Sequence, residues 1–199
     1  MPLIVLEGID GCGKTTQADL LAEALTAAGK PVRRLREPGG TRLGEQVRAL
    51  LLDPATQACP VAELFGYLTA RAQLCHEILS PALARGEWVL MDRFWPSTVA
   101  YQAYGLGLNP VPVRAAIDLA LHGIRMDHAF WLDVDPDEAL RRRRAGRAGD
   151  DRIELRGQEY QRKVASGYAA LAQDGVLTRI DANVSVEAMA RDLKTRIFG

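Results

Sequence analysis

A phosphate-binding loop at residues 8–15 constrains the fold of this chain more than any other feature. The loop reads Gly-Ile-Asp-Gly-Cys-Gly-Lys-Thr and matches the pattern G-x-x-x-x-G-K-[S/T]. An apolar run at 3–6 precedes it, and a helix-like stretch begins near Lys14. Glycines let backbone N–H groups turn inward around a triphosphate, and the positive end of the following helix dipole faces the same anion. This order of strand, loop and helix predicts that the chain binds a nucleoside triphosphate.

Individual loop positions have distinct expected roles. Lys14 can reach the outer phosphates, and the Thr15 hydroxyl can ligate Mg²⁺. A second magnesium element is expected where the apolar strand 88–91 ends in Asp92. Many strands end in Asp only as a helix cap, but next to a phosphate loop the pattern favours a metal role for Asp92. The residues expected to surround ATP are Gly8, Ile9, Asp10, Gly11, Cys12, Gly13, Lys14, Thr15 and Thr16.

Composition argues against several classes of protein. At 199 residues the chain fits a single domain, 1–199, with a sizeable core. Lys plus Arg and Asp plus Glu are equal at 25 each, so no overall positive field is available to hold nucleic acid. The three cysteines are far apart and lack metal-ligand spacing, which favours a reducing compartment. Because no signal peptide or membrane-spanning run is recognisable, we expect a cytoplasmic protein that binds neither membranes nor nucleic acid.

Short apolar runs alternate with longer helical stretches along the chain. This alternation predicts an α/β fold of the P-loop NTPase type, a three-layer arrangement with a five-stranded parallel sheet between helices. Strands are expected at 2–7, 31–36, 87–92, 128–134 and 176–180. Helices are expected at 14–28, 42–52, 61–84, 95–104, 111–121, 137–145, 155–173 and 185–197. Gly29, Gly86 and Gly175 fall where a left-handed residue ends a helix, and Asp135 is the expected N-cap of helix 137–145.

Phosphate loops of this kind occur in GTPases, motors, ATPases and small-molecule kinases, so other residues must discriminate. The GTPase motif N-K-x-D is absent, because Asn109 and Asn183 are the only asparagines and neither precedes Lys. A small kinase must bind an acceptor phosphate and exclude water from the transferring group. Arg71, Arg93 and Glu37 are expected near strand ends or on a helix that faces them, where they can help to hold an acceptor. The arginine-rich, glycine-flanked segment 141–154 is a candidate lid over the donor.

Four further motifs carry a more specific signal. They are EPGGT at 37–41, LFGYLTARAQ at 64–73, DR at 92–93 followed by STVAYQ at 97–102, and DRIE at 151–154. In their order and spacing, together with the phosphate loop, they resemble the thymidylate kinase family over essentially the whole chain. The resemblance implies transfer of the γ-phosphoryl group of ATP to dTMP, giving dTDP, with Mg²⁺ and in a homodimer.

The resemblance also implies roles for single residues around the acceptor. Tyr67 matches an aromatic residue that stacks on the thymine ring. Arg71, one helical turn later, matches an arginine that donates to a thymine carbonyl. Thr98 and Gln102 align with polar residues near the base. Tyr101 matches a tyrosine placed against the 2′ position of the sugar, where its ring favours deoxyribose.

Charged residues match positions where the acceptor meets the donor. Asp10 matches a loop carboxylate that approaches the 3′-hydroxyl of the sugar, and Arg93 matches the arginine that grips the acceptor phosphate. The residues expected to bind dTMP are Asp10, Glu37, Pro38, Tyr67, Arg71, Arg93, Ser97, Thr98, Tyr101 and Gln102.

The family divides by where its catalytic arginine lies. Some members carry a basic residue in the phosphate loop, whereas others have glycine there and an arginine in the lid. Gly11 and Arg147 match the second kind, so Lys14, Arg93 and Arg147 are the expected catalytic residues. The arginine run 141–144 leaves the choice of lid arginine open, and we expect at least two of its members to be only a solvated helix face.

Two other functions remain as alternatives. A kinase for another nucleotide or nucleoside would use the same phosphate sites, but the base-facing set Tyr67, Arg71, Thr98 and Gln102 argues against it. A non-catalytic, nucleotide-dependent switch would bind nucleotide without a phosphate acceptor. The dimer contact is expected on the broad apolar face of helix 61–84 or of helix 155–173, although burial within the monomer explains both faces equally well.

Overall fold

The computed structural model describes residues 2–146 and 151–199 and contains the expected five-stranded sheet. Its strands are β1 (Leu3–Glu7), β2 (Val32–Arg36), β3 (Trp88–Asp92), β4 (His128–Asp133) and β5 (Thr178–Asp181). Every strand pair is parallel. The predicted fold class is therefore confirmed, because a parallel sheet of this kind needs helical crossovers between its strands.

The strand order is β2-β3-β1-β4-β5, with β1 at the centre. From β1 the chain runs to the β2 edge, returns to β3, and then continues on the other side of β1 to β4 and β5. Residues 3–6 of β1 are completely buried, as expected for a strand covered on both faces. Because ligands of open α/β sheets bind where the strand order reverses, the carboxyl end of β1 is the expected position for a site.

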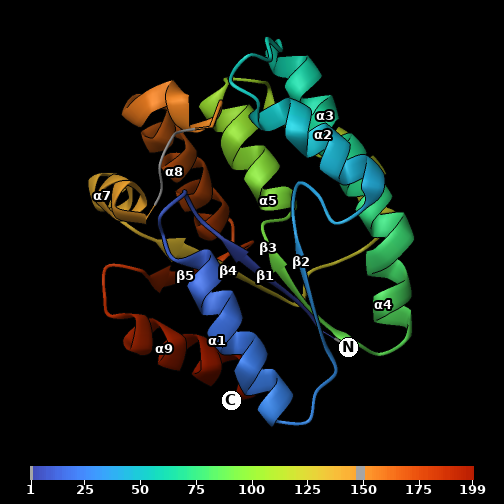
Figure 1. Ribbon diagram of the computed structural model, residues 1–199, viewed down its shortest axis with the longest axis vertical. Helices are drawn as coiled ribbons and strands as arrows, with labels where there is room; N and C mark the ends of the chain where they lie inside the picture. The colour runs from blue at the N-terminus through green and yellow to red at the C-terminus, as the bar shows by residue number, and fades with distance from the viewer. Residues whose placement is uncertain (1, 147–150) are drawn as a thin grey trace.

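Helices cover both faces of the sheet (Figure 1). On one face, α1 (Lys14–Ala27) packs against α9 (Val186–Phe198). On the other, α8 (Gly157–Gln173) packs closely against η2 (Val99–Gly105). Apart from the helical run at 60–84, the remaining helical segments of the described residues are α2 (Arg42–Leu52), α5 (Trp95–Thr98), α6 (Pro110–Leu121), α7 (Pro136–Gly146) and η3 (Glu154–Arg156).

The predicted helix 61–84 is a continuous helical run with a π-helical turn inside it. It comprises α3 (Pro60–Leu74), the π segment η1 (Cys75–Leu79) and α4 (Ser80–Ala84). Pro81 has no N–H to donate to a preceding carbonyl, and a wider turn just before it accommodates this loss. The predicted helix 95–104 likewise changes to π geometry at Val99. Such π turns often occur at functional sites, and this one carries Tyr101 and Gln102.

Helix ends follow the sequence signals. Gly29, Gly86 and Gly175 have φ angles of 71°, 80° and 73°, the left-handed values expected after a helix. Asp135 Oδ1 accepts hydrogen bonds from the backbone N–H groups of Asp137 (2.9 Å) and Glu138 (3.1 Å), which confirms it as the cap of α7. Across the part of the chain that the structure describes, no helix is both long and apolar enough to cross a membrane.

Candidate active site

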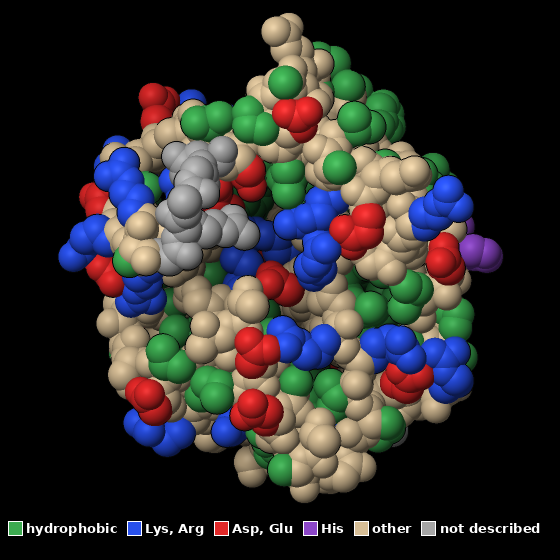
Figure 2. Space-filling view, viewed as in Figure 1, with side chains coloured by type: hydrophobic (Ala, Val, Ile, Leu, Met, Phe, Trp, Pro, Cys, Tyr) green, Lys and Arg blue, Asp and Glu red, His purple; other side chains and the backbone are tan. Residues whose placement is uncertain are grey.

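A cavity of about 970 Å³ opens at the carboxyl ends of β1, β2 and β3. Figure 2 shows this hollow, with basic and acidic side chains gathered around it. The predicted site residues that line it are Asp10, Gly11, Gly13, Lys14, Thr15, Thr16, Glu37, Pro38, Tyr67, Arg71, Asp92, Arg93, Ser97, Thr98, Tyr101 and Gln102. Among the described residues predicted for ATP, Gly8, Ile9 and Cys12 do not line it. The side chains of Ile9 and Cys12 are buried in the core instead.

The phosphate loop curls around the amino end of α1. Gly8, Gly11 and Gly13 have φ angles of 141°, 90° and 98°, which only glycine adopts readily. Lys14 Nζ donates hydrogen bonds to the carbonyl oxygens of Gly8 (2.9 Å) and Ile9 (3.1 Å). The ammonium group therefore lies across the mouth of the loop, where an outer phosphate of a nucleotide can replace these carbonyl oxygens.

Gly11 lies directly against α7. A Cβ atom at this position would come 2.2 Å from the carbonyl oxygen of Ala139, and the φ angle of 90° would strain any other residue. A basic side chain at position 11 would therefore require α7 to move.

Arg93 connects the phosphate loop to α5 and α8. Its Nη1 donates to Gly8 O (2.9 Å), Ser97 Oγ (3.2 Å) and Tyr168 Oη (3.1 Å), and its Nη2 donates to Asp10 Oδ1 (2.6 Å). Its φ of 68° is unusual for a residue other than glycine and costs roughly 1–3 kcal/mol. Such backbone strain is typical of functional sites and is retained when the surrounding contacts hold it.

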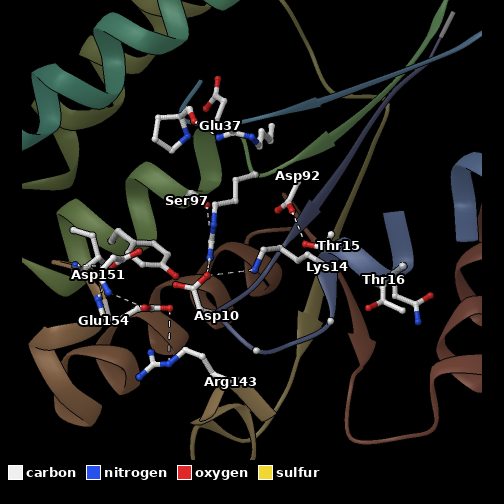
Figure 3. A pocket seen from close by; sticks show the side chains of 18 of the residues that line it. Asp10, Lys14, Thr15, Thr16, Glu37, Asp92, Ser97, Arg143, Asp151 and Glu154 are labelled. Carbon is white, nitrogen blue, oxygen red and sulfur yellow. Dashed lines mark hydrogen bonds and ion pairs between the residues drawn. The ribbon is translucent and has the colours of Figure 1, made fainter. Parts of the chain in front are cut away.

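Asp10 lies between two cations. Its Oδ1 is 2.6 Å from Arg93 Nη2 and 4.0 Å from Lys14 Nζ, so the side chain faces both groups in the cavity (Figure 3). Burial alone would raise its pKa, but Arg93 and Lys14 outweigh that effect and lower the pKa to about 2. Asp10 is therefore a carboxylate at every physiological pH and accepts hydrogen bonds only.

Arg71 is almost completely buried in the wall of the cavity. Its Nε is 2.9 Å from Glu37 Oε2, its Nη1 donates to Thr98 Oγ1 at 2.7 Å, and its Nη2 donates to Phe94 O at 3.0 Å. Nη2 also bonds to Glu37, so among the described residues only one Nη1 hydrogen has no acceptor. The guanidinium is rigidly oriented, with that one N–H remaining for a ligand.

Two tyrosines complete the wall. Tyr67 is half-buried on α3, one turn from Arg71, and burial raises the pKa of its phenol. Tyr101 is 6% exposed, and the Arg93 guanidinium lies 5.0 Å from the centre of its ring. The Tyr101 hydroxyl has no hydrogen-bond partner among the described residues. Both rings are placed to contact a flat, apolar ligand surface.

The proposed metal ligands lie at the rim of the same cavity. Thr15 Oγ1 donates a hydrogen bond to Asp92 Oδ2 at 3.4 Å. Both are oxygen donors of the kind that Mg²⁺ prefers.

The four arginines at 141–144 divide into two kinds. Arg142 and Arg143 line the cavity, whereas Arg141 is 75% exposed and Arg144 is also exposed. Arg147, the predicted lid arginine, lies outside the described residues.

Glu7 is a site residue that sequence reasoning missed. It is completely buried at the end of β1 and accepts hydrogen bonds from Ser97 Oγ (2.6 Å), Phe94 N (2.8 Å) and Tyr168 Oη (2.9 Å). Burial raises its pKa, although Arg93 acts in the opposite direction. A single carboxylate ending an otherwise apolar central strand was the available signal.

Glu7 does not line the cavity, but several residues that do line it also carried no motif. Arg48 Nη1 and Arg36 Nη1 donate to Pro38 O at 3.0 Å and 3.1 Å, which places two more cations beside the cavity. The Glu37–Pro38 peptide bond is cis. At the far end, beside α1 and α9, the cavity is lined by Gln17, Arg142, Val184, Ser185, Val186 and Met189.

Comparisons with known proteins identify the family. The thymidylate kinase family model matches residues 6–193. A thymidylate kinase of Gloeobacter violaceus is 44% identical over 98% of this chain and 93% of its own length. One of Parasynechococcus marenigrum is 43% identical over 98% and 96%, and one of Caldanaerobacter subterraneus is 44% identical over 86% and 81%. The chain therefore belongs to the thymidylate kinase family, and its activity is that of a dTMP kinase.

Proposed function

We propose that the cavity holds ATP on the phosphate loop and dTMP against η2, with the two phosphate groups meeting at Asp10. The observation that carries this assignment is the pair of cations on either side of that carboxylate, Lys14 on the donor side and Arg93 on the acceptor side. Two anions can approach each other closely only where fixed positive charge offsets their repulsion.

On the acceptor side, we place dTMP by the arginine N–H groups that have no acceptor among the described residues. Within the described residues no acceptor faces the Nε–H or one Nη2 hydrogen of Arg93, and we assign these two donors to the phosphate of dTMP. Arg71 retains one Nη1 hydrogen for a thymine carbonyl, while Tyr67 stacks on the ring. We place the 2′ position of the sugar against the buried ring of Tyr101, where a ribose hydroxyl would be crowded out.

On the donor side, we place Mg²⁺ on Thr15 and Asp92. Their oxygen atoms are close enough to share one small cation, and both lie at the cavity rim beside Lys14. When bound, Mg²⁺ neutralises charge on the β- and γ-phosphate oxygens. The residues themselves orient the two phosphates in line and exclude water, and no covalent intermediate on the enzyme is required.

We also propose that residues 141–154 act as the lid within a single kinase domain, with Arg147 as the arginine that approaches the transferring group. The close contact of Gly11 with Ala139 supports this choice, because the loop has no room for a basic side chain there. Arg143, which lines the cavity near Asp10, is the second candidate.

A homodimer through α2 and α3 is part of the proposal, in a cytosolic enzyme. Leu50, Val61 and Phe65 on these two helices are 64%, 47% and 57% exposed. Large apolar side chains gathered on adjacent helices are typical of a surface that a second protein covers. This exposure favours the helix at 61–84 over the helix at 155–173.

An acceptor panel tests the proposal. ADP production is measured with ATP, Mg²⁺ and each of dTMP, dUMP, UMP, CMP and AMP. We expect dTMP to have the highest kcat/KM. A preference for any other acceptor would overturn the placement of the base-facing residues and favour the alternative nucleotide kinase.

A further inference from the structure

Glu63 is a completely buried carboxylate that receives hydrogen bonds from three elements of the fold. Its Oε1 accepts from Gln102 Nε2 at 3.0 Å, on η2. Its Oε2 accepts from Arg152 Nη2 at 2.7 Å, and Arg156 Nη1 donates to Oε1 at 3.1 Å. Arg152 lies within the proposed lid segment 141–154 and Arg156 follows it. One buried anion therefore joins the end of this segment to η2.

The charge of Glu63 is maintained by these partners. Burial opposes ionisation, but the hydrogen bonds from Arg156, Gln102 and Arg152 outweigh it and lower the pKa of Glu63. An ionised carboxylate accepts hydrogen bonds and donates none.

This restricts the orientation of the Gln102 amide. A glutamine amide has a donor end, Nε2, and an acceptor end, Oε1, and which end faces a neighbour is decided by that neighbour. Only Nε2 can face Glu63, because Oε1 would be repelled by the carboxylate. Gln102 also lines the cavity, and within residues 2–146 and 151–199 nothing donates to its Oε1. The acceptor end is therefore available to a ligand.

We propose that Glu63 is a positioning residue that determines which pyrimidine the enzyme accepts, by holding Gln102 with its acceptor oxygen toward the base. The inference rests on the proposed placement of Gln102 beside the base. Thymine carries a hydrogen on N3 and donates to Gln102 Oε1. Cytosine carries a lone pair on N3, so two acceptors would face each other and the base would be rejected.

The test compares dTMP with 5-methyl-dCMP, which differ only at N3 and at the exocyclic group on C4. The measured quantity is the ratio of kcat/KM for the two acceptors in wild-type, E63Q, Q102A and E63Q/Q102A enzymes. In E63Q the new amide at position 63 can both donate and accept hydrogen bonds, so either end of the Gln102 amide can face it. The volume of the side chain at position 63 is almost unchanged. The ratio for one preparation does not depend on how much of the protein is folded.

We expect E63Q to lower the dTMP/5-methyl-dCMP ratio tenfold or more, and the double variant to lower it no further than Q102A alone. E159Q is the matched control, since Glu159 is 83% exposed on α8, and its ratio stays at the wild-type value. An unchanged ratio in E63Q, with a lowered ratio in Q102A, would overturn the role of Glu63 and leave the placement of Gln102 intact. An unchanged ratio in Q102A would overturn both.

A measurement on the wild-type enzyme covers the case in which E63Q does not fold. The side-chain amide hydrogens of Gln102 are identified by NMR as the pair lost in Q102A. We expect one of them to exchange slowly with solvent before dTMP is added and to remain bonded after it. Rapid exchange of both hydrogens in the free enzyme would contradict the inference.

Discussion

Replacement of Arg93 by alanine is the most informative perturbation of the proposed site. Its Nη1 hydrogens are used by Gly8, Ser97 and Tyr168, and one Nη2 hydrogen is used by Asp10. Among the described residues, two N–H groups of Arg93 therefore have no acceptor and are assigned to the acceptor phosphate. Hydrogen bonds to charged groups contribute about 1.5–3 kcal/mol each, so losing two weakens transition-state binding by roughly 3–6 kcal/mol. We expect kcat/KM for dTMP to fall about 10²–10⁴-fold.

The assay is coupled ADP production with dTMP varied at saturating ATP, together with calorimetric titration of each nucleotide. Arg93→Lys keeps the charge but not the fork, so we expect an intermediate loss of about 10–10²-fold, equivalent to one charged hydrogen bond. Arg196→Ala is the control, because that arginine is 43% exposed and, in the part of the chain that the structure describes, pairs only with Asp192 of its own helix.

Stability must be measured in parallel, because Arg93→Ala also removes the ion pair with Asp10 and one of the two hydrogen bonds that Gly8 O accepts. Asp10 is about one-third exposed, so water replaces part of the lost interaction. If folded R93A retains kcat/KM for dTMP within tenfold of wild type, Arg93 does not hold the acceptor phosphate and the reasoning is refuted.

Three further perturbations test the neighbouring residues. Tyr101→Ala should lower the ratio of kcat/KM for dTMP over ribothymidine monophosphate, because the buried ring no longer excludes a 2′-hydroxyl; an unchanged ratio would show that the ring does not select the sugar. Arg147→Ala should lower kcat more than it weakens ATP binding, and the opposite pattern in titration and kinetics would make Arg147 a binding residue. The pKa of Asp10 is about 2 in the folded protein against an ordinary value of 3.8, so its ion pairs stabilise the fold fully above about pH 4 and are lost as the pH falls towards 2. Chemical unfolding should therefore show the free energy of unfolding falling more steeply between these values in wild type than in Asp10→Asn, and parallel curves would contradict the assignment.

The strands and most helix ends could be predicted from local sequence. The central strand β1 and its neighbour β4 are buried on both faces and read as continuous apolar runs. Glycine after a helix and Asp135 before one are chemical signals that act over a few residues. The strand order has no such local signal, because it is decided by contacts between segments far apart in the chain.

The site residues that could be predicted also have local sequence signals, whereas those that were missed depend on contacts between distant segments. The phosphate loop, the EPGGT segment and the DR segment can be recognised as motifs in the sequence, and the structure brings them to one cavity. Glu63 reads locally as an acidic residue in the first turn of a helix, which is common because it complements the helix dipole. Its partners Gln102, Arg152 and Arg156 lie 39, 89 and 93 positions away, so only the folded chain reveals the cluster.

The central claim is that the acceptor phosphate binds Arg93 on the opposite side of Asp10 from Lys14. A crystal structure with dTMP and a non-hydrolysable ATP analogue tests it most directly. The account predicts that the dTMP phosphate accepts hydrogen bonds from Arg93 Nε and Nη2, while the γ-phosphate lies against Lys14 Nζ. A dTMP phosphate held instead by Arg36 and Arg48, with Arg93 bonded only to protein atoms, would contradict it.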